Sequence, residues 1–149
     1  MWRGFLLGLM AGAGLARADG FAFVTAERAA PIVVAAEEPE CVRLAAEDLA
    51  SDVQKITGKR PEIVSGGQVP AGACVWIGTK AGGPWESYRV GVEGGRLLIE
   101  GGDARGTMFG VYAFTERFLQ VDPLAFWSGR EPAKRAELRW DSVDRKSVV

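Results

Sequence analysis

The sequence predicts an α/β domain, in the form of an α+β sandwich with a single mixed sheet of about five strands and two main helices. Three observations predict this class. Residues 40–57 and 104–120 carry apolar side chains with the period of a helix, and short apolar runs bounded by glycine and proline lie between them. Because the chain has 149 residues, of which 48% are apolar, we expect one packed core.

Residues 1–18 are typical of a secretory signal peptide. Arg3 supplies a positive charge, residues 5–15 are apolar, and the run ARA at residues 16–18 has the small-x-small pattern that precedes cleavage. The apolar run is about half of the roughly 20 residues that span a bilayer. A buried or membrane-anchoring N-terminal helix is the alternative. We expect an exported protein, periplasmic or extracellular, that is free of the membrane after cleavage.

The first elements of the domain are a strand and a helix. Residues 31–35 (PIVVA) are apolar enough for a short buried strand. The helix of residues 40–57 follows, and Gly58 and Pro61 end it. Its apolar side chains fall within an arc about 100° wide and its polar side chains lie opposite. We therefore expect this helix to cover one face of a sheet.

The middle of the chain predicts strands. Residues 61–64 and 73–77 are separated by a turn-rich segment, and the second run is apolar on both faces, as in a central strand. Apolar and polar residues alternate over residues 86–93, Gly94-Gly95 forms a two-residue turn, and residues 96–100 return as a hairpin. The first βα unit predicts parallel strands, whereas the hairpin is antiparallel.

The second helix, residues 104–120 with Asp103 as N-cap, carries more apolar surface than the first. Its apolar side chains fill about half the circumference, and a strip of small residues, Gly106, Gly110 and Ala113, lies beside them. A glycine inside a helix costs about 1 kcal/mol relative to alanine, which indicates close approach of another element. Phe109 projects on the polar side. A second partner surface over this helix and a single partly exposed Phe on an ordinary domain are the two interpretations.

Composition excludes several functions. The 18 basic and 19 acidic residues give no basic footprint for nucleic acid. The chain has no histidine, which removes Ser-His-Asp and Cys-His catalysis and histidine metal ligation. We expect no catalytic, metal-binding or cofactor-binding residue in this chain.

Two features could suggest a bound ligand and are better explained by structure. Gly101, Gly102 and Gly106 fit neither a dinucleotide-binding fingerprint nor a phosphate-binding loop ending in Gly-Lys-Ser/Thr, so a strand-to-helix turn is favoured. The acidic residues around the first helix favour a solvated face over a glycosidase pair, which needs two carboxyls in a cleft. They are Glu37, Glu38, Glu40, Glu47, Asp48 and Asp52.

The two cysteines and the tryptophans are the remaining candidates. Cys41 begins the first helix, near the C-terminal end of the first strand, whereas Cys74 begins a strand expected to run parallel to that strand. The two cysteines should therefore lie at opposite ends of the sheet, and we expect no disulfide between them. Trp76 belongs to a core strand and is expected to be structural. Trp85 and Trp127 lie near loops. Packing is the favoured interpretation of each, and a carbohydrate contact is the alternative.

Three motifs carry a resemblance to a known family. They are Glu86-Ser-Tyr-Arg-Val90, Leu97-Leu-Ile-Glu-Gly101 and Arg105-Gly-Thr-Met-Phe-Gly-Val-Tyr112. Together they resemble the small α/β domain that precedes the catalytic barrel in several glycoside hydrolases, including family 67 α-glucuronidases and family 20 β-hexosaminidases. The continuation Val121-Asp-Pro-Leu-Ala-Phe-Trp127, with Glu131-Pro132 and Arg135, looks most like glycoside hydrolase family 115.

The resemblance implies a non-catalytic N-terminal domain of an exported α-glucuronidase-like enzyme that acts in glucuronoxylan breakdown. Its catalytic acids would belong to a barrel, which needs about 200 residues or more. We expect residues 19–135 to form the accessory domain and residues 136–149 to begin a linker or the next, truncated domain. The barrel is the expected partner in cis, and polysaccharide is a further candidate partner. Candidate carbohydrate or interdomain contacts are Trp127, Phe126, Phe109 and Trp85. A stand-alone carbohydrate-binding or scaffold module is the alternative.

Overall fold

The computed structural model describes residues 20–140, so the predicted signal peptide lies outside the described residues. The elements in chain order are β1 (Phe21–Val24), β2 (Ile32–Ala35), α1 (Glu40–Thr57), β3 (Ile63–Gly66), β4 (Val75–Thr79), β5 (Tyr88–Glu93), β6 (Arg96–Gly101), α2 (Ala104–Phe114), the π-helix η1 (Thr115–Leu119), α3 (Ala125–Ser128) and β7 (Leu138–Trp140). No helix within residues 20–140 is both long and apolar enough to cross a bilayer.

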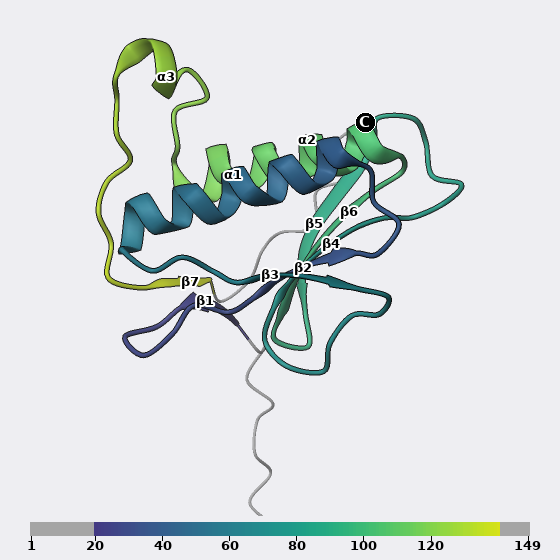
Figure 1. The fold of residues 1–149 in the computed structure, drawn as a ribbon, viewed down its shortest axis with the longest axis horizontal. Helices are drawn as coiled ribbons and strands as arrows, with labels where there is room; N and C mark the ends of the chain where they lie inside the picture. The colour runs from purple at the N-terminus through teal and green to yellow at the C-terminus, as the bar shows by residue number, and fades with distance from the viewer. Residues whose placement is uncertain (1–19, 141–149) are drawn as a thin grey trace, which may run out of the picture.

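The predicted mixed sheet is confirmed. Its five strands lie in the order β3-β2-β4-β6-β5. The pairs β2–β3, β2–β4 and β4–β6 are parallel, and only the β5–β6 hairpin within this sheet is antiparallel. The turn residues Gly94 and Gly95 have φ of 56° and 72°, the left-handed conformation that a two-residue hairpin turn requires. The long helices α1 and α2 lie side by side on one face of the sheet (Figure 1).

Helix α1 begins and ends where the sequence predicts. Gly58 adopts a left-handed conformation with φ of 78°, and its N–H donates to the Gln54 carbonyl at 2.8 Å. This capping pattern favours glycine because a Cβ would be strained there. The buried residues form the predicted apolar stripe: Val42, Ala45, Ala46, Leu49, Ala50, Val53 and Ile56.

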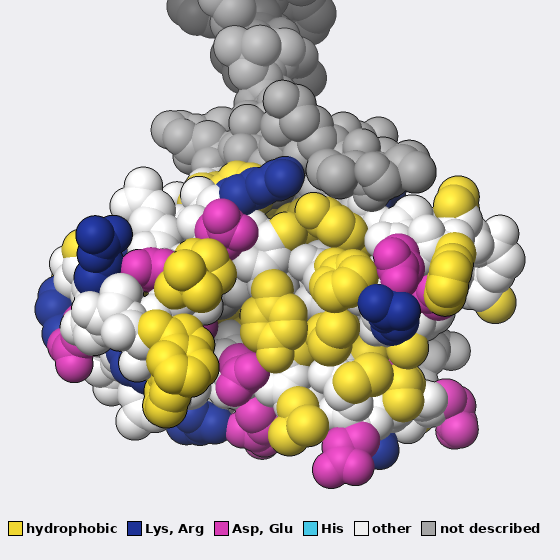
Figure 2. Space-filling model, turned by 90° about the horizontal axis from the view of Figure 1, so that it is seen from above, with side chains coloured by type: hydrophobic (Ala, Val, Ile, Leu, Met, Phe, Trp, Pro, Cys, Tyr) yellow, Lys and Arg dark blue, Asp and Glu magenta, His cyan; other side chains and the backbone are white. Residues whose placement is uncertain are grey.

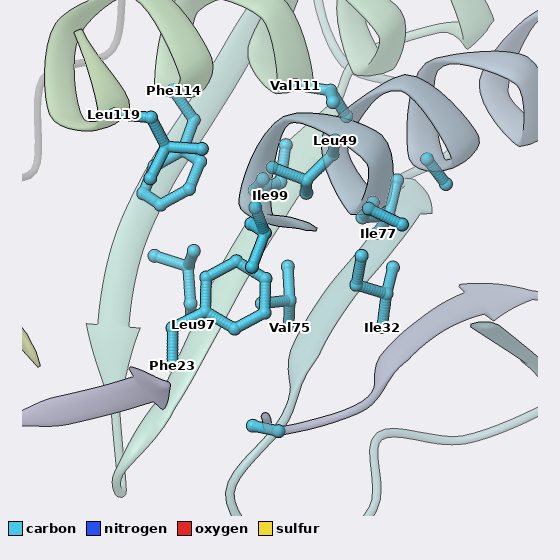
Figure 3. Close-up of a cluster of buried hydrophobic side chains, with 14 of the residues drawn as sticks. Phe23, Ile32, Leu49, Val75, Ile77, Leu97, Ile99, Val111, Phe114 and Leu119 are labelled. Carbon is cyan, nitrogen blue, oxygen red and sulfur yellow. The ribbon is translucent and has the colours of Figure 1, made fainter. Parts of the chain in front are cut away.

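The main core lies between the helices and the sheet. Figure 3 shows side chains from β1 and from the central strands pointing toward side chains of α1, α2 and η1. Leu49 of α1, Ile77 of β4 and Ile99 of β6 have no solvent-exposed surface. Each fully buried aliphatic side chain contributes about 1.5–3 kcal/mol of hydrophobic stabilisation, so this layer is the main stabilising contact of the domain.

A smaller apolar cluster lies apart from the main core and includes Val33, Cys74, Trp76 and Leu98. The structural role predicted for Trp76 is therefore confirmed, since this side chain is 9% exposed. Burial raises the pKa of the Cys74 thiol. Cys41 is exposed at the start of α1, and both cysteines are free thiols. The parallel pairing of β2 with β4, on which the expectation of no disulfide depended, is confirmed.

A second sheet that the sequence did not predict extends the packed unit beyond residue 135. Strands β1 and β7 pair antiparallel, with Phe21 opposite Trp140. Leu138 is buried, and the Trp140 ring lies 5.3 Å from the Phe114 ring in an edge-on arrangement. Residues 138–140 therefore belong to the packed domain, although the boundary was expected at residue 135.

The charged segment between α3 and β7 also belongs to the domain. The Lys134 ammonium donates to the Lys55 carbonyl at 2.6 Å, and the Arg135 guanidinium donates to the Leu119 carbonyl at 2.6 Å. The backbone N–H of Arg135 donates to the Ile56 carbonyl at 3.0 Å. These cations interact favourably with the negative C-terminal ends of two helices. The packed unit therefore includes this charged segment.

The wide apolar surface of the second helix is covered largely within the domain. Helix α2 contacts the sheet and α1, and the Phe118 ring of η1 lies 6.3 Å from the Trp140 ring. A Cβ on Gly110 would lie 2.9 Å from Ile99 Cγ2 and 3.2 Å from Tyr88 Cβ. The close approach predicted from the small residues is confirmed, and the approaching element is the β5–β6 hairpin. From Thr115 the helix continues with π-type bonding, which the sequence did not predict.

Candidate interaction surface

The four predicted contact residues form two separate groups. Phe126 and Trp127 lie on α3, with their rings 5.2 Å apart in an edge-on pair. Trp85 and Phe109 flank the Arg105 guanidinium near the start of α2. The helix from Ala104 to Leu119 separates the two groups, a length of roughly 24 Å at 1.5 Å per residue. No single site therefore contains all four residues.

The first group projects from the domain on what we call the α3 arm, residues 121–131. Figure 1 shows α3 rising above the helix layer at the end farthest from the start of α2. The exposed fractions are 89% for Phe126, 83% for Trp127 and 60% for Leu124. Exposed aromatic residues gathered in one place mark interaction sites, because a folded domain gains nothing from leaving them in water.

Asp122 holds the α3 arm in shape. Its Oδ1 accepts from the Leu124 N–H at 2.8 Å, and its Oδ2 accepts from the Ser128 hydroxyl at 3.0 Å. These hydrogen bonds, the backbone one above all, lower the pKa of the Asp122 carboxyl. Gly129 ends α3 with φ of 66°. The arm thus presents its exposed aromatic pair on a defined turn.

A groove lies between the α3 arm, α1 and the α2–η1 helix. Its volume is about 430 Å³, and its apolar lining includes Tyr112, Val121 and Phe126. Its charged lining residues are Asp48, Asp52, Lys55, Glu116 and Asp122. Figure 2, which views the helix layer from above, shows acidic side chains between the hydrophobic groups at its left edge and at its centre.

Tyr112 connects the two helices beside this groove. Its hydroxyl donates to Asp48 Oδ2 at 2.8 Å. Burial first, and then the Asp48 carboxylate, raise the pKa of Tyr112 to about 12. The phenol therefore stays protonated and keeps its hydrogen bond throughout the neutral range.

The second group surrounds Arg105. Its guanidinium carbon lies 6.0 Å from the Trp85 ring centroid and 5.8 Å from that of Phe109, within cation–π range, and its Nη1 pairs with Glu86 at 3.0 Å. Trp85 is 75% exposed, whereas Phe109 is half-buried. Arg105 was not among the contact residues predicted from the sequence. Its spacing of four residues from Phe109 places both on one helix face, and this spacing was the available signal.

The glycine-rich turn packs against the loop that carries Trp85. We call this region the glycine corner, residues 83–87 packed on residues 101–110. A Cβ on Gly102 would lie 2.2 Å from the Pro84 carbonyl oxygen, and one on Gly106 would lie 2.1 Å from that of Ser87. The backbone of residues 84–87 thus occupies the space beside these glycines. These contacts confirm the predicted structural turn, which the sequence favoured above a phosphate-binding loop.

Asp103 serves both sides of the glycine corner. Its Oδ1 accepts from the Gly106 N–H at 2.6 Å, as an N-cap does, and its Oδ2 accepts from the Glu86 N–H at 3.1 Å. The hydrogen bond from Gly106 is the main cause of the lowered pKa of Asp103. The second bond holds Glu86 in a left-handed conformation with φ of 56°.

Four of the acidic residues around α1, Glu38, Glu47, Asp48 and Asp52, have polar partners, and Glu38 is not solvated as expected. Glu38 is only 5% exposed; its carboxylate accepts from the Thr79 N–H at 2.5 Å and from the Thr79 hydroxyl at 2.9 Å. The Thr79 hydroxyl also contacts the Thr107 hydroxyl at 2.7 Å. Glu38 therefore ties the start of α1 to the end of β4. Within residues 20–140 no three His, Cys, Asp or Glu side chains form a group that could hold a metal ion.

Fold and surface together define a small α/β domain with projecting aromatic groups. No family model and no curated protein matches the chain. Among solved structures, the fold is similar to part of a family GH115 4-O-methyl-α-glucuronidase with specificity for decorated arabinogalactans. That match has a TM-score of 0.67 and 21% identity, and covers 85% of this chain and 18% of the enzyme.

Two bacterial β-hexosaminidases contain a similar unit. A mutant enzyme from Streptomyces plicatus in complex with product matches with a TM-score of 0.50 and 19% identity, over 80% of this chain and 21% of its own length. A family GH20 enzyme from Streptomyces coelicolor A3(2) matches with a TM-score of 0.50 and 18% identity, over 80% of this chain and 22% of its own. The chain thus spans about a fifth of each of these glycoside hydrolases and shares the fold of that part of each enzyme.

Proposed function

We propose that this chain is the non-catalytic N-terminal domain of an exported, α-glucuronidase-like glycoside hydrolase that acts on glucuronoxylan. In this proposal the domain supports a catalytic barrel that is a separate unit of the same polypeptide. The similarity to a part of a family GH115 enzyme supports the assignment to this kind of enzyme. The chain covers a small share of that enzyme, which favours a non-catalytic role for the domain.

The observation that carries the proposal is the exposure of the α3 arm. Phe126 and Trp127 present most of their ring surface to water on a turn that Asp122 holds in shape. Large aromatic side chains are enriched at the centres of protein interfaces and contribute much of the binding free energy there. A neighbouring domain that covers the arm accounts for this exposure.

An activity assay of this chain tests the catalytic part of the proposal. Incubated with glucuronoxylan and with aryl glycosides, the chain releases no uronic acid and no aglycone. Clear turnover that co-purifies with the folded chain would refute the proposal. The family GH115 enzyme of the comparison, assayed on a decorated arabinogalactan, is the positive control for the detection of released uronic acid.

Export is proposed from the sequence of residues 1–18 and has its own test. Expressed with its native N-terminus in a Gram-negative host, the protein should reach the periplasm and begin at Asp19 after cleavage. Peptide mass analysis of each cell fraction measures both results. An intact Arg3 on protein retained in the cytoplasm would contradict export.

A stand-alone carbohydrate-binding module is the second candidate, favoured by the exposed indole rings of Trp85 and Trp127. It predicts saturable binding of xylan or uronic acid oligomers in calorimetry. Trp85→Ala or Trp127→Ala should then weaken binding about fivefold or more, since a stacked aromatic contributes about 1 kcal/mol or more. Unchanged affinity in both variants would exclude this candidate in the stated form.

A further inference from the structure

We propose that the groove between the α3 arm, α1 and the α2–η1 helix binds an arginine-bearing polypeptide segment of the neighbouring domain. This inference rests on the proposed function, because it assumes that a neighbouring domain covers the arm. It adds the location of the contact and the chemistry of the segment that fills it. Size, apolar lining, charge and aromatic rim each support the assignment.

The size and lining of the groove suit a side chain of a polypeptide. Its volume of about 430 Å³ falls within the range of ligand pockets, roughly 300–1,000 Å³. Apolar side chains from three places in the sequence, Tyr112, Val121 and Phe126, line it. The methylene groups of a long side chain can pack on such a surface while the charged head reaches the rim.

The charge of the groove selects a cation. Four carboxylates line it, whereas Lys55 is its single basic lining residue among the described residues, and Lys55 pairs with Asp52 at 3.1 Å. Asp48 accepts one hydrogen bond from Tyr112, which leaves acceptor capacity on a carboxylate with two oxygens. Glu116 is exposed at the first turn of η1. The groove therefore carries net negative charge and accepts hydrogen-bond donors.

The aromatic rim distinguishes arginine from lysine. Phe126 lines the groove, its ring lies 5.2 Å from the ring of Trp127, and both rings keep most of their surface exposed. A guanidinium stacks on aromatic faces and donates in plane to carboxylates, whereas an ammonium is a compact, strongly hydrated charge. The same pairing of Arg with aromatic rings occurs inside this domain at Trp85, Arg105 and Phe109.

The same charges disfavour the polysaccharide as occupant. Glucuronoxylan carries carboxylates on its uronic acid branches, and like charges brought together in a partly dehydrated groove destabilise the complex. Of the two macromolecules in the proposed function, the polypeptide is therefore the one that the groove fits.

Calorimetric titration with an oligoarginine peptide tests the inference. We expect saturable binding to this chain, weaker binding of oligolysine, and none of oligoglutamate or of methylglucuronoxylan oligosaccharides. The double variant Asp48→Asn with Glu116→Gln should weaken oligoarginine binding about fivefold to tenfold, since exposed ion pairs contribute roughly 0.2–1 kcal/mol each. Phe126→Ala should weaken it by a similar factor.

A matched control separates a site from general charge attraction. Glu27 and Glu62 are exposed acids outside the groove, and the double variant Glu27→Gln with Glu62→Gln makes the same change in net charge. Equal losses in both double variants, no binding of oligoarginine, or saturable oligosaccharide binding that Phe126→Ala abolishes would each overturn the inference. Circular dichroism of every variant verifies the fold.

The outcome is separable from that of the activity assay. Turnover by this chain would refute the supporting role whatever the groove binds. Conversely, a chain without turnover and without localised oligoarginine binding would leave the supporting role intact and refute the groove as the contact.

Discussion

The glycine corner and the α3 arm differ in where their residues find partners. The sequence favoured a structural turn for the first and gave the candidate contacts Phe126 and Trp127 for the second. In the glycine corner each unusual residue has a partner inside the domain: Gly102 and Gly106 contact the loop backbone, and Asp103 accepts two backbone hydrogen bonds. On the α3 arm, Phe126 and Trp127 contact mainly each other. Residues whose contacts lie inside the domain give no information about a partner. Exposed apolar side chains on an ordered turn indicate a contact with a partner outside the domain.

Among substitutions that compare the two regions, the largest loss of stability is expected in the glycine corner. Gly106→Ala places a methyl group 2.1 Å from the Ser87 carbonyl oxygen, and because backbone must move, we expect a loss of about 3 kcal/mol in the free energy of unfolding. Gly72→Ala is the control, since a Cβ there meets nothing within 4 Å. Urea denaturation measures both. Equal stability of the two variants would show that the corner is not tightly packed.

The next largest loss of stability is expected in the segment that joins the α3 arm to β7. Arg135→Ala removes the donor to the Leu119 carbonyl, and we expect a loss of about 1.5 kcal/mol because the hydrogen bond is charge-assisted. Arg130→Ala removes a cation whose side chain is 80% exposed on the arm itself and should change stability by less than about 0.5 kcal/mol. A similar small change for both residues would place the whole segment outside the packed unit.

Tyr112, which lies between the two regions, gives a pH dependence. Its pKa is about 12 in the folded protein, above the ordinary value of 10.0, so the protonated phenol stabilises the fold. That stability is fully present below pH 10 and is lost as the pH rises through about 12. Since Tyr112 is 42% exposed, solvent screening reduces the effect to the order of 1 kcal/mol. Tyr112→Phe should remove this component, measured by denaturation at several alkaline pH values. An unchanged pH profile would contradict the role of the hydrogen bond to Asp48.

The smallest change in stability is expected for substitutions on the α3 arm. Phe126→Ala and Trp127→Ala together should change the free energy of unfolding by less than about 0.5 kcal/mol, because both rings are already in water. Phe114→Ala, a buried aromatic in α2, should cost about 3–5 kcal/mol in the same thermal or urea measurement. A loss above about 2 kcal/mol for the arm variant would mean that the arm packs on the domain.

Local signals in the sequence were enough to predict α1, the hairpin and the cap of α2. Periodicity fixed the buried face of α1, Gly58 fixed its end, and Asp103 caps α2 as expected. These features depend on residues a few positions apart. The likeness of the fold to part of a family GH115 enzyme also agrees with the resemblance carried by the motifs.

Long-range contacts were the features that the sequence could not predict. Strand β1 has four residues and pairs with β7 at the other end of the described chain, so neither strand has a local signal. Glu38 looks like one more acid before a helix, and its burial depends on Thr79 in a later strand. The apolar arc of α2 left a second partner surface as one of two interpretations, and α1 and Trp140 cover much of that arc.

Amide chemical-shift mapping tests the central claim most directly, because it locates a contact residue by residue. Titration of the isotopically labelled chain with oligoarginine should shift the amides of Asp48, Tyr112, Glu116 and Phe126, and leave those of Trp85 and Gly106 unchanged. The matching titration with methylglucuronoxylan oligosaccharides should leave the α3 arm unchanged. Shifts at the arm with the oligosaccharide and not with the peptide would contradict the account and make the arm a carbohydrate site.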